Sequence, residues 1–213
     1  MTIMSGTNVY IDGFNLYYGC LKDSPYKWLD LESLCERLLP SNRIGTIRYF
    51  TARVNDRADD PGGDRRQAIY LRALGTLPKV VVHFGHFLSH PVRMPLAHPK
   101  AHGPKTAEVI KTEEKGSDVN LATYLLVDAF DKVCRTAVVI SNDGDLKEPL
   151  RIARDKLRLK IGVVNPNNAG RRSQALVPAT DFYKTIRAST LEACQFPAQL
   201  TDGRGTFSKP STW

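Results

Sequence analysis

The chain has 213 residues, of which 42% are apolar and 24% charged, and its formal net charge at pH 7 is +8. This composition is typical of a globular protein and excludes collagen-like, coiled-coil and wholly disordered chains. Apolar runs stay short of the roughly 18 residues that a helix needs to cross a bilayer, so we expect no membrane partner. The excess of positive charge favours a polyanionic partner such as nucleic acid.

The sequence favours a cytoplasmic protein. Residues 1–7 lack the basic and apolar regions of a secretory signal peptide. The four cysteines, Cys20, Cys35, Cys134 and Cys194, are far apart and form no C-x-x-C pair. We therefore expect reduced thiols.

Short β-rich runs alternate with amphipathic stretches along the chain. The predicted order is strand 7–11, helix 14–21, helix 30–39 with Asp30 as N-cap, strand 44–52, helix 64–74, strand 79–88, strand 108–112, helix 117–132, strand 136–140, helix 146–157, strand 160–164 and helix 181–193. Parallel strands need crossover connections, and helices supply them here. The order predicts an α/β fold, a parallel sheet with helices on both faces.

Two segments depart from this alternation. Residues 89–106 are rich in proline and contain His90, His98 and His102, which lack a familiar zinc-binding spacing. We predict an irregular loop there that contacts RNA rather than metal. Residues 198–213 are predicted to be a mobile tail, which leaves a single domain over residues 1–197.

Carboxylates directly follow three predicted strands. Asp12 follows strand 7–11, Asp118 comes soon after strand 108–112, and Asp143 and Asp145 follow strand 136–140. Ligands of open α/β sheets bind at the carboxyl ends of the strands, so we expect these side chains to meet. Carboxylates that meet stay ionised together when a cation neutralises them, and oxygen ligands suit Mg²⁺ or Mn²⁺. Such an ion can activate water and stabilise a scissile phosphate.

Each acid alone also fits the start of a helix. Asp12 can cap the helix that follows it, Asp118 lies in a first turn, and Asp145 with Glu148 resembles a capping box. Capping does not explain Asp143, because Asp145 already fills that role. The coincidence of three matching strand ends therefore favours a shared site.

Three segments resemble the NYN domains of the PIN-like nuclease superfamily, in the LabA-like branch. These segments are VYIDGFNLY (9–17), EKGSDVNLATYLLVDAF (114–130) and VVISNDGDL (138–146). The resemblance extends from about residue 7 to residue 182. It implies a Rossmann-like, PIN-like parallel sheet and an endoribonuclease that uses Mg²⁺ or Mn²⁺ and acts on single-stranded RNA, with DNA left open as a substrate.

The resemblance also implies roles for individual residues. The expected metal-binding and catalytic residues are Asp12, Asp118, Asp143 and Asp145. Asn15 and Ser141 match motif positions and are expected at the substrate, and Lys115 is expected to contact phosphate as a point charge. Two departures bear on access to the site: Asn142 stands where the family commonly has Gly, and Gly144 replaces the more usual Ser.

A further basic stretch follows the third motif. Arg151 and Arg154 would share one face of a helix and are predicted to bind substrate. A solvated helix face is the alternative interpretation.

Two other functions compete with the nuclease. A haloacid-dehalogenase-like phosphatase would need an Asp two residues after Asp12, where Phe14 stands, so the sequence disfavours it. An RNA-binding or regulatory module of the same fold, with little turnover, stays open. Homo-oligomerisation also stays open.

Overall fold

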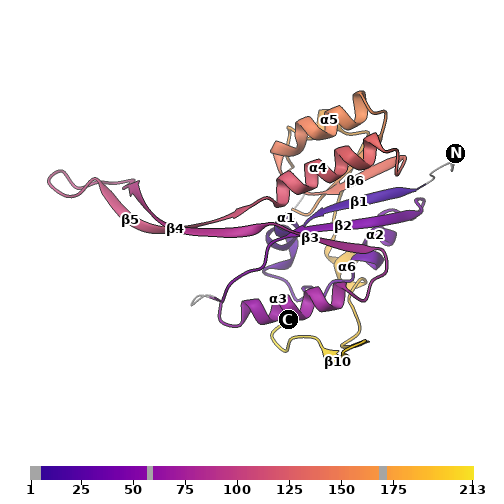
Figure 1. Cartoon of the computed structure of the whole chain (residues 1–213), viewed down its shortest axis with the longest axis horizontal. Helices are drawn as coiled ribbons and strands as arrows, with labels where there is room; N and C mark the ends of the chain where they lie inside the picture. The colour runs from indigo at the N-terminus through magenta and orange to yellow at the C-terminus, as the bar shows by residue number, and fades with distance from the viewer. Residues whose placement is uncertain (1–5, 57–59, 168–171) are drawn as a thin grey trace.

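The computed structural model describes residues 6–56, 60–167 and 172–213. Residues 1–5, 57–59 and 168–171 of the predicted domain lie outside the described residues. The centre is a six-stranded parallel sheet of order β3-β2-β1-β6-β7-β8 (Figure 1). Its strands are β1 (Thr7–Asp12), β2 (Ile44–Thr51), β3 (Val80–Phe84), β6 (Thr136–Ile140), β7 (Lys160–Asn165) and β8 (Phe182–Thr185). The predicted α/β fold is confirmed.

Helices cover both faces of the sheet (Figure 1). One face carries α2 (Leu31–Leu38), α3 (Gly63–Leu74) and α6 (Ala188–Glu192), and the other carries α4 (Ser117–Phe130) and α5 (Lys147–Asp155). A short helix α1 (Gly13–Leu16) follows β1 directly and continues as a π-helical turn over Tyr17–Leu21. Single 3₁₀ turns occupy Gly144–Leu146 and Val177–Ala179. Within the described ranges, no helix has the length and apolar character needed to span a bilayer.

The alternation of side chains along each strand builds two cores. Val9 and Ile11 pack toward α2 and α3, whereas Tyr10 between them packs toward α4 and α5. In β6 the same alternation places Val138 on the first face and Val139 on the second. Successive strand residues point to opposite faces, so runs of apolar residues serve both cores.

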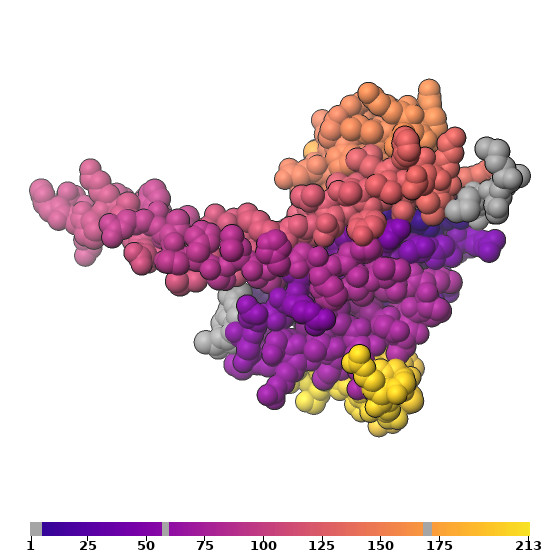
Figure 2. Space-filling view, viewed as in Figure 1, coloured from indigo at the N-terminus to yellow at the C-terminus, as the bar shows by residue number. Residues whose placement is uncertain are grey.

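An antiparallel arm replaces the predicted loop at 89–106. The arm comprises β4 (His86–Pro95) and β5 (Thr106–Lys115) and projects away from the body of the molecule (Figures 1 and 2). The prediction of an irregular segment is therefore wrong for residues 89–95 and 106, which belong to the two strands, and holds for residues 96–105 at the tip of the arm. Pro91 and Pro95 are tolerated because both strands of a two-stranded sheet are edges, where a missing N–H need not break the ladder. The predicted strand 108–112 belongs to this arm and not to the parallel sheet.

The C-terminal part of the chain holds two further differences. The predicted helix 181–193 is wrong in its first half, since β8 pairs with β7 as an edge strand and only α6 is helical. Gly162 of β7 leaves room that the ring of Phe182 fills, because a Cβ at Gly162 would overlap that ring. The predicted tail contains a hairpin, β9 (Gln199–Asp202) and β10 (Gly205–Ser208), which the sequence analysis missed.

Candidate active site

The candidate site lies where the strand order of the sheet reverses. β1 and β6 are neighbours at its centre, and the chain leaves them toward opposite edges of the sheet. The crevice outside the carboxyl ends of such strands is the usual ligand site of an open α/β sheet. Asp12 is the last residue of β1, and Ser141 directly follows β6.

Asp12 is a buried carboxylate held by two donors. One oxygen accepts a hydrogen bond from the backbone N–H of Asn15 at 2.9 Å, and the other accepts one from the hydroxyl of Ser141 at 3.0 Å. Asp12 is therefore the N-cap of α1, as the alternative interpretation allowed, and it also faces the candidate site. The side-chain oxygen of Asn15 accepts from the backbone N–H of Asn142 at 3.1 Å, which ties the segment after β1 to the segment after β6.

Asp143 and Asp145 follow β6 in a tight turn. The hydroxyl of Ser141 accepts from the backbone N–H of Asp143 at 3.1 Å, and the Asp143 carboxylate accepts from the backbone N–H of Asp145 at 3.0 Å. Asp143 is thus the cap of this turn, rather than Asp145 as the sequence suggested. Ser141 contacts both Asp12 and Asp143 and sets their relative position.

Asp118 reaches the site from α4, which follows the arm. Because β5 is outside the parallel sheet, Asp118 does not lie at the end of a sheet strand as predicted; the first turn of α4 carries it to the same edge. Gly116, with φ of 97°, is the N-cap of α4. Glu114 accepts from the backbone N–H of Ser117 at 3.1 Å and from its hydroxyl at 2.6 Å.

These residues surround a hollow of about 260 Å³, which we call the acidic hollow. Its lining residues are Asp12, Phe14, Asn15, Tyr18, Phe87, Glu114, Ser117, Asp118 and Asp143. Phe87 at the root of the arm contacts Phe14 edge-on, with 5.7 Å between ring centres. The sequence analysis did not select Glu114 or Phe87. Glu114 could have been found as the acid that opens the second motif, but Phe87 carries no sequence signal.

The acids raise one another's proton affinity. Burial raises the pKa of Asp12, which the hydrogen bonds from Asn15 and Ser141 partly oppose. The pKa of Asp118 is raised to about 6, first by loss of solvation and then by the charges of Asp12, Asp143, Glu114 and Asp145. Like charges that gather at one place favour protonation unless a cation is present.

The chemistry of the lining fits a divalent cation, although the side chains do not form a closed set of ligands. The donors are carboxylate oxygens, which suit Mg²⁺ or Mn²⁺. The described part of the chain contains no group of three His, Cys, Asp or Glu side chains placed to hold a metal ion as they stand. After loss of solvation, repulsion by the neighbouring acids raises the pKa of Asp118, and a bound cation would relieve this repulsion.

The remaining predicted substrate residues lie apart from the acidic hollow. Lys115 is exposed at the end of β5, with its ammonium 3.6 Å from Glu113. Arg151 pairs with Glu148, and Arg154 pairs with Asp155 at 2.8 Å. Among the described residues, none of these three cations lines the acidic hollow. Asn15 and Ser141, in contrast, are part of the site.

Comparisons with known proteins identify relatives over nearly the whole chain. A family model described as the NYN domain matches residues 6–186. A Pseudomonas putida protein named 6-hydroxy-3-succinoylpyridine 3-monooxygenase HspA is 33% identical over 97% of this chain and 75% of its own length. A solved structure of a Vibrio parahaemolyticus protein of unknown function has a TM-score of 0.55 at 15% identity, covering 88% of this chain and 96% of its own. The last likeness concerns the fold.

Proposed function

Because the chain belongs to the NYN domain family, a nuclease-like group, we propose that it is a divalent-metal-dependent endoribonuclease that hydrolyses phosphodiester bonds at the acidic hollow. The observation that carries the proposal is the gathering of carboxylates from β1, α4 and the turn after β6 around one hollow, where loss of solvation and then the neighbouring charges raise the pKa of Asp118 to about 6. Repulsion between these carboxylates destabilises the folded state unless a bound cation neutralises them.

The chain's own residues would hold the ion and position the substrate. Asp12, Asp118 and Asp143 line the hollow, with Asp145 next to them, and are the proposed ligands of Mg²⁺ or Mn²⁺. When bound, the cation supplies positive charge for the phosphate that is cleaved. The hydroxyl of Ser141 keeps Asp12 in place and keeps its carboxylate available.

RNA is the proposed partner because the chain carries a net charge of +8 around an acidic site. Positive charge at a distance attracts a polyanion, while the acids act only where the phosphate is cleaved. The arm carries exposed Arg93, Lys100 and Lys105, and it starts at the acidic hollow. We therefore propose that the arm contacts RNA beside the site, in a cytoplasmic protein.

Cleavage of labelled single-stranded RNA and DNA tests the proposal. The wild type is incubated with Mn²⁺, Mg²⁺ or EDTA beside Asp143→Asn, with Asp131→Asn as the control, since Asp131 is an exposed acid at the end of α4. We expect metal-dependent RNA cleavage that Asp143→Asn loses and Asp131→Asn keeps. RNA binding by all three proteins without cleavage under any metal would instead support the regulatory module.

The monooxygenase name of the Pseudomonas putida relative supports a second candidate, oxygenation of a hydroxypyridine-type ring. Its support is 33% identity across nearly the whole chain. The test is oxygen uptake and loss of 6-hydroxy-3-succinoylpyridine in the presence of reduced nicotinamide and flavin. Turnover of the pyridine that persists in Asp143→Asn, with no RNA cleavage by the wild type, would favour this candidate over the nuclease.

A further inference from the structure

A second and larger hollow lies beside the acidic one. Its volume is about 690 Å³, within the range of roughly 300–1,000 Å³ that small-molecule sites occupy. We call it the aromatic hollow, because its walls include Tyr17, Tyr18, Tyr49, Tyr70 and Trp213. Phe14 and Tyr18 border both hollows, so the two sites are neighbours.

The aromatic walls come from parts of the chain that the fold brings together. Tyr17 and Tyr18 belong to the π-helical turn after α1, Tyr49 to β2, Tyr70 to α3, and Trp213 is the last residue. The hydroxyl of Tyr70 donates to the carbonyl of Leu29 at 2.9 Å, which fixes the side chain. The ring of Tyr70 lies against the ring of Trp213, with 5.8 Å between the ring centres. Rings in such number offer flat apolar surfaces that suit a planar aromatic ligand.

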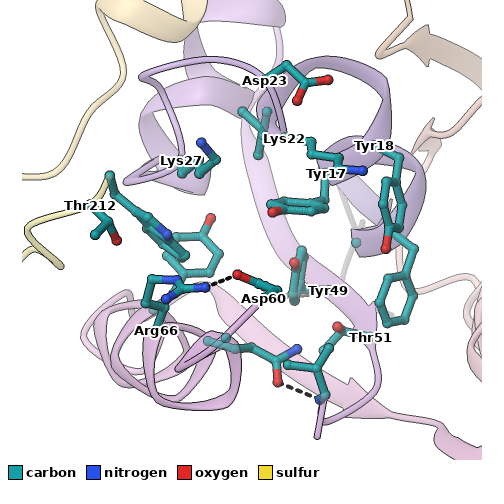
Figure 3. A pocket seen from close by; sticks show the side chains of 18 of the residues that line it. Tyr17, Tyr18, Lys22, Asp23, Lys27, Tyr49, Thr51, Asp60, Arg66 and Thr212 are labelled. Atoms are coloured by element: carbon teal, nitrogen blue, oxygen red, sulfur yellow. Dashed lines mark hydrogen bonds and ion pairs between the residues drawn. The ribbon is translucent and has the colours of Figure 1, made fainter. Parts of the chain in front are cut away.

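The charges at the hollow favour an anion. The described lining residues carry three cationic side chains, Lys22, Lys27 and Arg66, against the two carboxylates of Asp23 and Asp60. Figure 3 shows Lys22, Lys27 and Asp23 on one side of the hollow and the ion pair of Arg66 with Asp60 on the opposite side. Among the side chains that line the hollow, one positive charge is therefore in excess.

The lysines keep donors for a ligand. The ammonium of Lys27 donates to the carbonyl of Ser24 at 3.0 Å, and the ammonium of Lys22 lies 5.4 Å from the centre of the Tyr18 ring. Because an ammonium has three donors, these contacts leave N–H groups for an anion. Lys22 follows directly after the π-helical turn that carries Tyr17 and Tyr18, and Lys27 lies in the loop beyond it, so ring and charge would be recognised side by side.

From these observations we propose that the aromatic hollow binds a planar aromatic ring that carries one negative charge, with the ring against the tyrosines and the anionic group at Lys22 and Lys27. Two sources offer this chemistry: a single nucleotide of bound RNA and a free aromatic carboxylic acid. The proposal does not require that the acidic hollow cleaves RNA.

Calorimetric titration of the full chain tests the site directly. The probes are the methyl esters of uridine and adenosine 5′-monophosphate for the nucleotide source, because their phosphodiester carries one negative charge as in RNA, and pyridine-3-carboxylate for the free acid. Matched controls are the nucleosides and pyridine-3-carboxamide, which keep the ring without the charge, and inorganic phosphate and acetate, which keep the charge without the ring. We expect saturable binding of at least one aromatic anion and weaker binding of every control.

Two substitutions locate the binding. Lys27→Gln removes one charge from the hollow, and we expect about tenfold weaker binding of the anion, as for one lost charge-assisted hydrogen bond, with the neutral ring unaffected. Tyr17→Leu removes one wall and weakens both. Lys156→Gln is the control, since Lys156 is exposed beyond α5, and it leaves both affinities unchanged.

Fluorescence adds a readout inside the hollow. The chain has two tryptophans, of which Trp28 is fully buried and Trp213 lines the hollow. Bound ligand changes the emission of the wild type, and Trp213→Phe loses that change. Circular dichroism verifies that each variant is folded.

The outcomes separate the sources. Binding of the nucleotides alone assigns the hollow to RNA, and binding of the pyridine acid alone assigns it to a free aromatic acid; both support the proposal. Absence of saturable binding by any aromatic anion overturns it. Binding that Lys27→Gln and Tyr17→Leu both leave unchanged overturns it as well. Whether the acidic hollow cleaves RNA is a separate question, and the comparison of the wild type with Asp143→Asn answers it.

Discussion

Replacing Asp118 by Asn should stabilise the protein in the absence of divalent metal. Loss of solvation and then the charges of the acids around it raise the pKa of Asp118 to about 6. An ordinary Asp, and Asp118 in the unfolded chain, titrates near 3.8. The folded state therefore binds the proton more tightly than the unfolded state does between these two pH values. Stability falls as the pH rises through that window, and at pH 7 the folded state carries the full penalty.

The size of the penalty follows from the same two values. A pKa near 6 against 3.8 corresponds to at most roughly 3 kcal/mol. Although its carboxylate loses part of its solvation, the Asp118 residue keeps much of its surface in contact with solvent, and screening reduces the contribution to about 1 kcal/mol. Asn keeps the shape without the charge, so Asp118→Asn should gain about this amount at pH 7 and almost nothing at pH 4.

Urea unfolding in EDTA, followed at pH 4 and pH 7, measures the effect. Asp131→Asn is the control, because this exposed acid is away from the acidic hollow, and its stability should stay within about 0.5 kcal/mol of the wild type. Mn²⁺ at roughly 100 times its dissociation constant should stabilise the wild type by about 2.7 kcal/mol, and Asp118→Asn by less. A variant that is less stable than the wild type at pH 7, or equally changed at both pH values, would refute the reasoning.

Three further predictions concern single contacts. Arg48 pairs with the buried Asp128 through two hydrogen bonds of 2.9 and 2.8 Å, so Arg48→Met should lower the free energy of unfolding in urea by roughly 3 kcal/mol, because it leaves a buried carboxylate without its cation; an unchanged free energy of unfolding would contradict this. Gly162→Ala should lower the free energy of unfolding by roughly 1–3 kcal/mol because the added methyl group meets the ring of Phe182. Adding Phe182→Leu should restore stability, and a single variant as stable as the wild type would disprove the overlap. Ser141→Ala removes the hydroxyl that donates to the buried carboxylate of Asp12, and the pKa of Asp12 should rise further. RNA cleavage at pH 6 should therefore fall about tenfold and recover at higher pH. An unchanged pH profile of cleavage would count against the proposed role.

The sequence predicted the central strands β1, β6 and β7 of the parallel sheet well because they are apolar runs that are buried on both faces. The strand at Thr136–Ile140 was predicted residue for residue, and all five of its residues are buried. The acids at the ends of β1 and β6 were also predictable, since the position after a buried strand fixes where a side chain emerges. Asp118 was placed at the right edge for the wrong reason, because α4 and not a sheet strand carries it there.

The arm and β8 were missed because partners distant in sequence determine them. Pro91 argues against a strand unless that strand has a free edge, and the free edge is a property of the hairpin as a whole. Phe182 begins a strand because Gly162 of the neighbouring strand leaves room for its ring. The aromatic hollow was hidden for the same reason, since its walls meet only after residues as distant as Tyr17 and Trp213 are brought together.

The arm is long, and its base forms part of the acidic hollow. Each of its strands has ten residues and spans roughly 33 Å at about 3.3 Å per residue. At the base of the arm, Phe87 contacts Phe14, and Glu114 accepts a hydrogen bond from the hydroxyl of Ser117. All four residues line the acidic hollow. A ligand bound at the tip is therefore roughly 33 Å from the acidic hollow, yet it is held by the same two strands that supply Phe87 and Glu114 to the lining of that hollow.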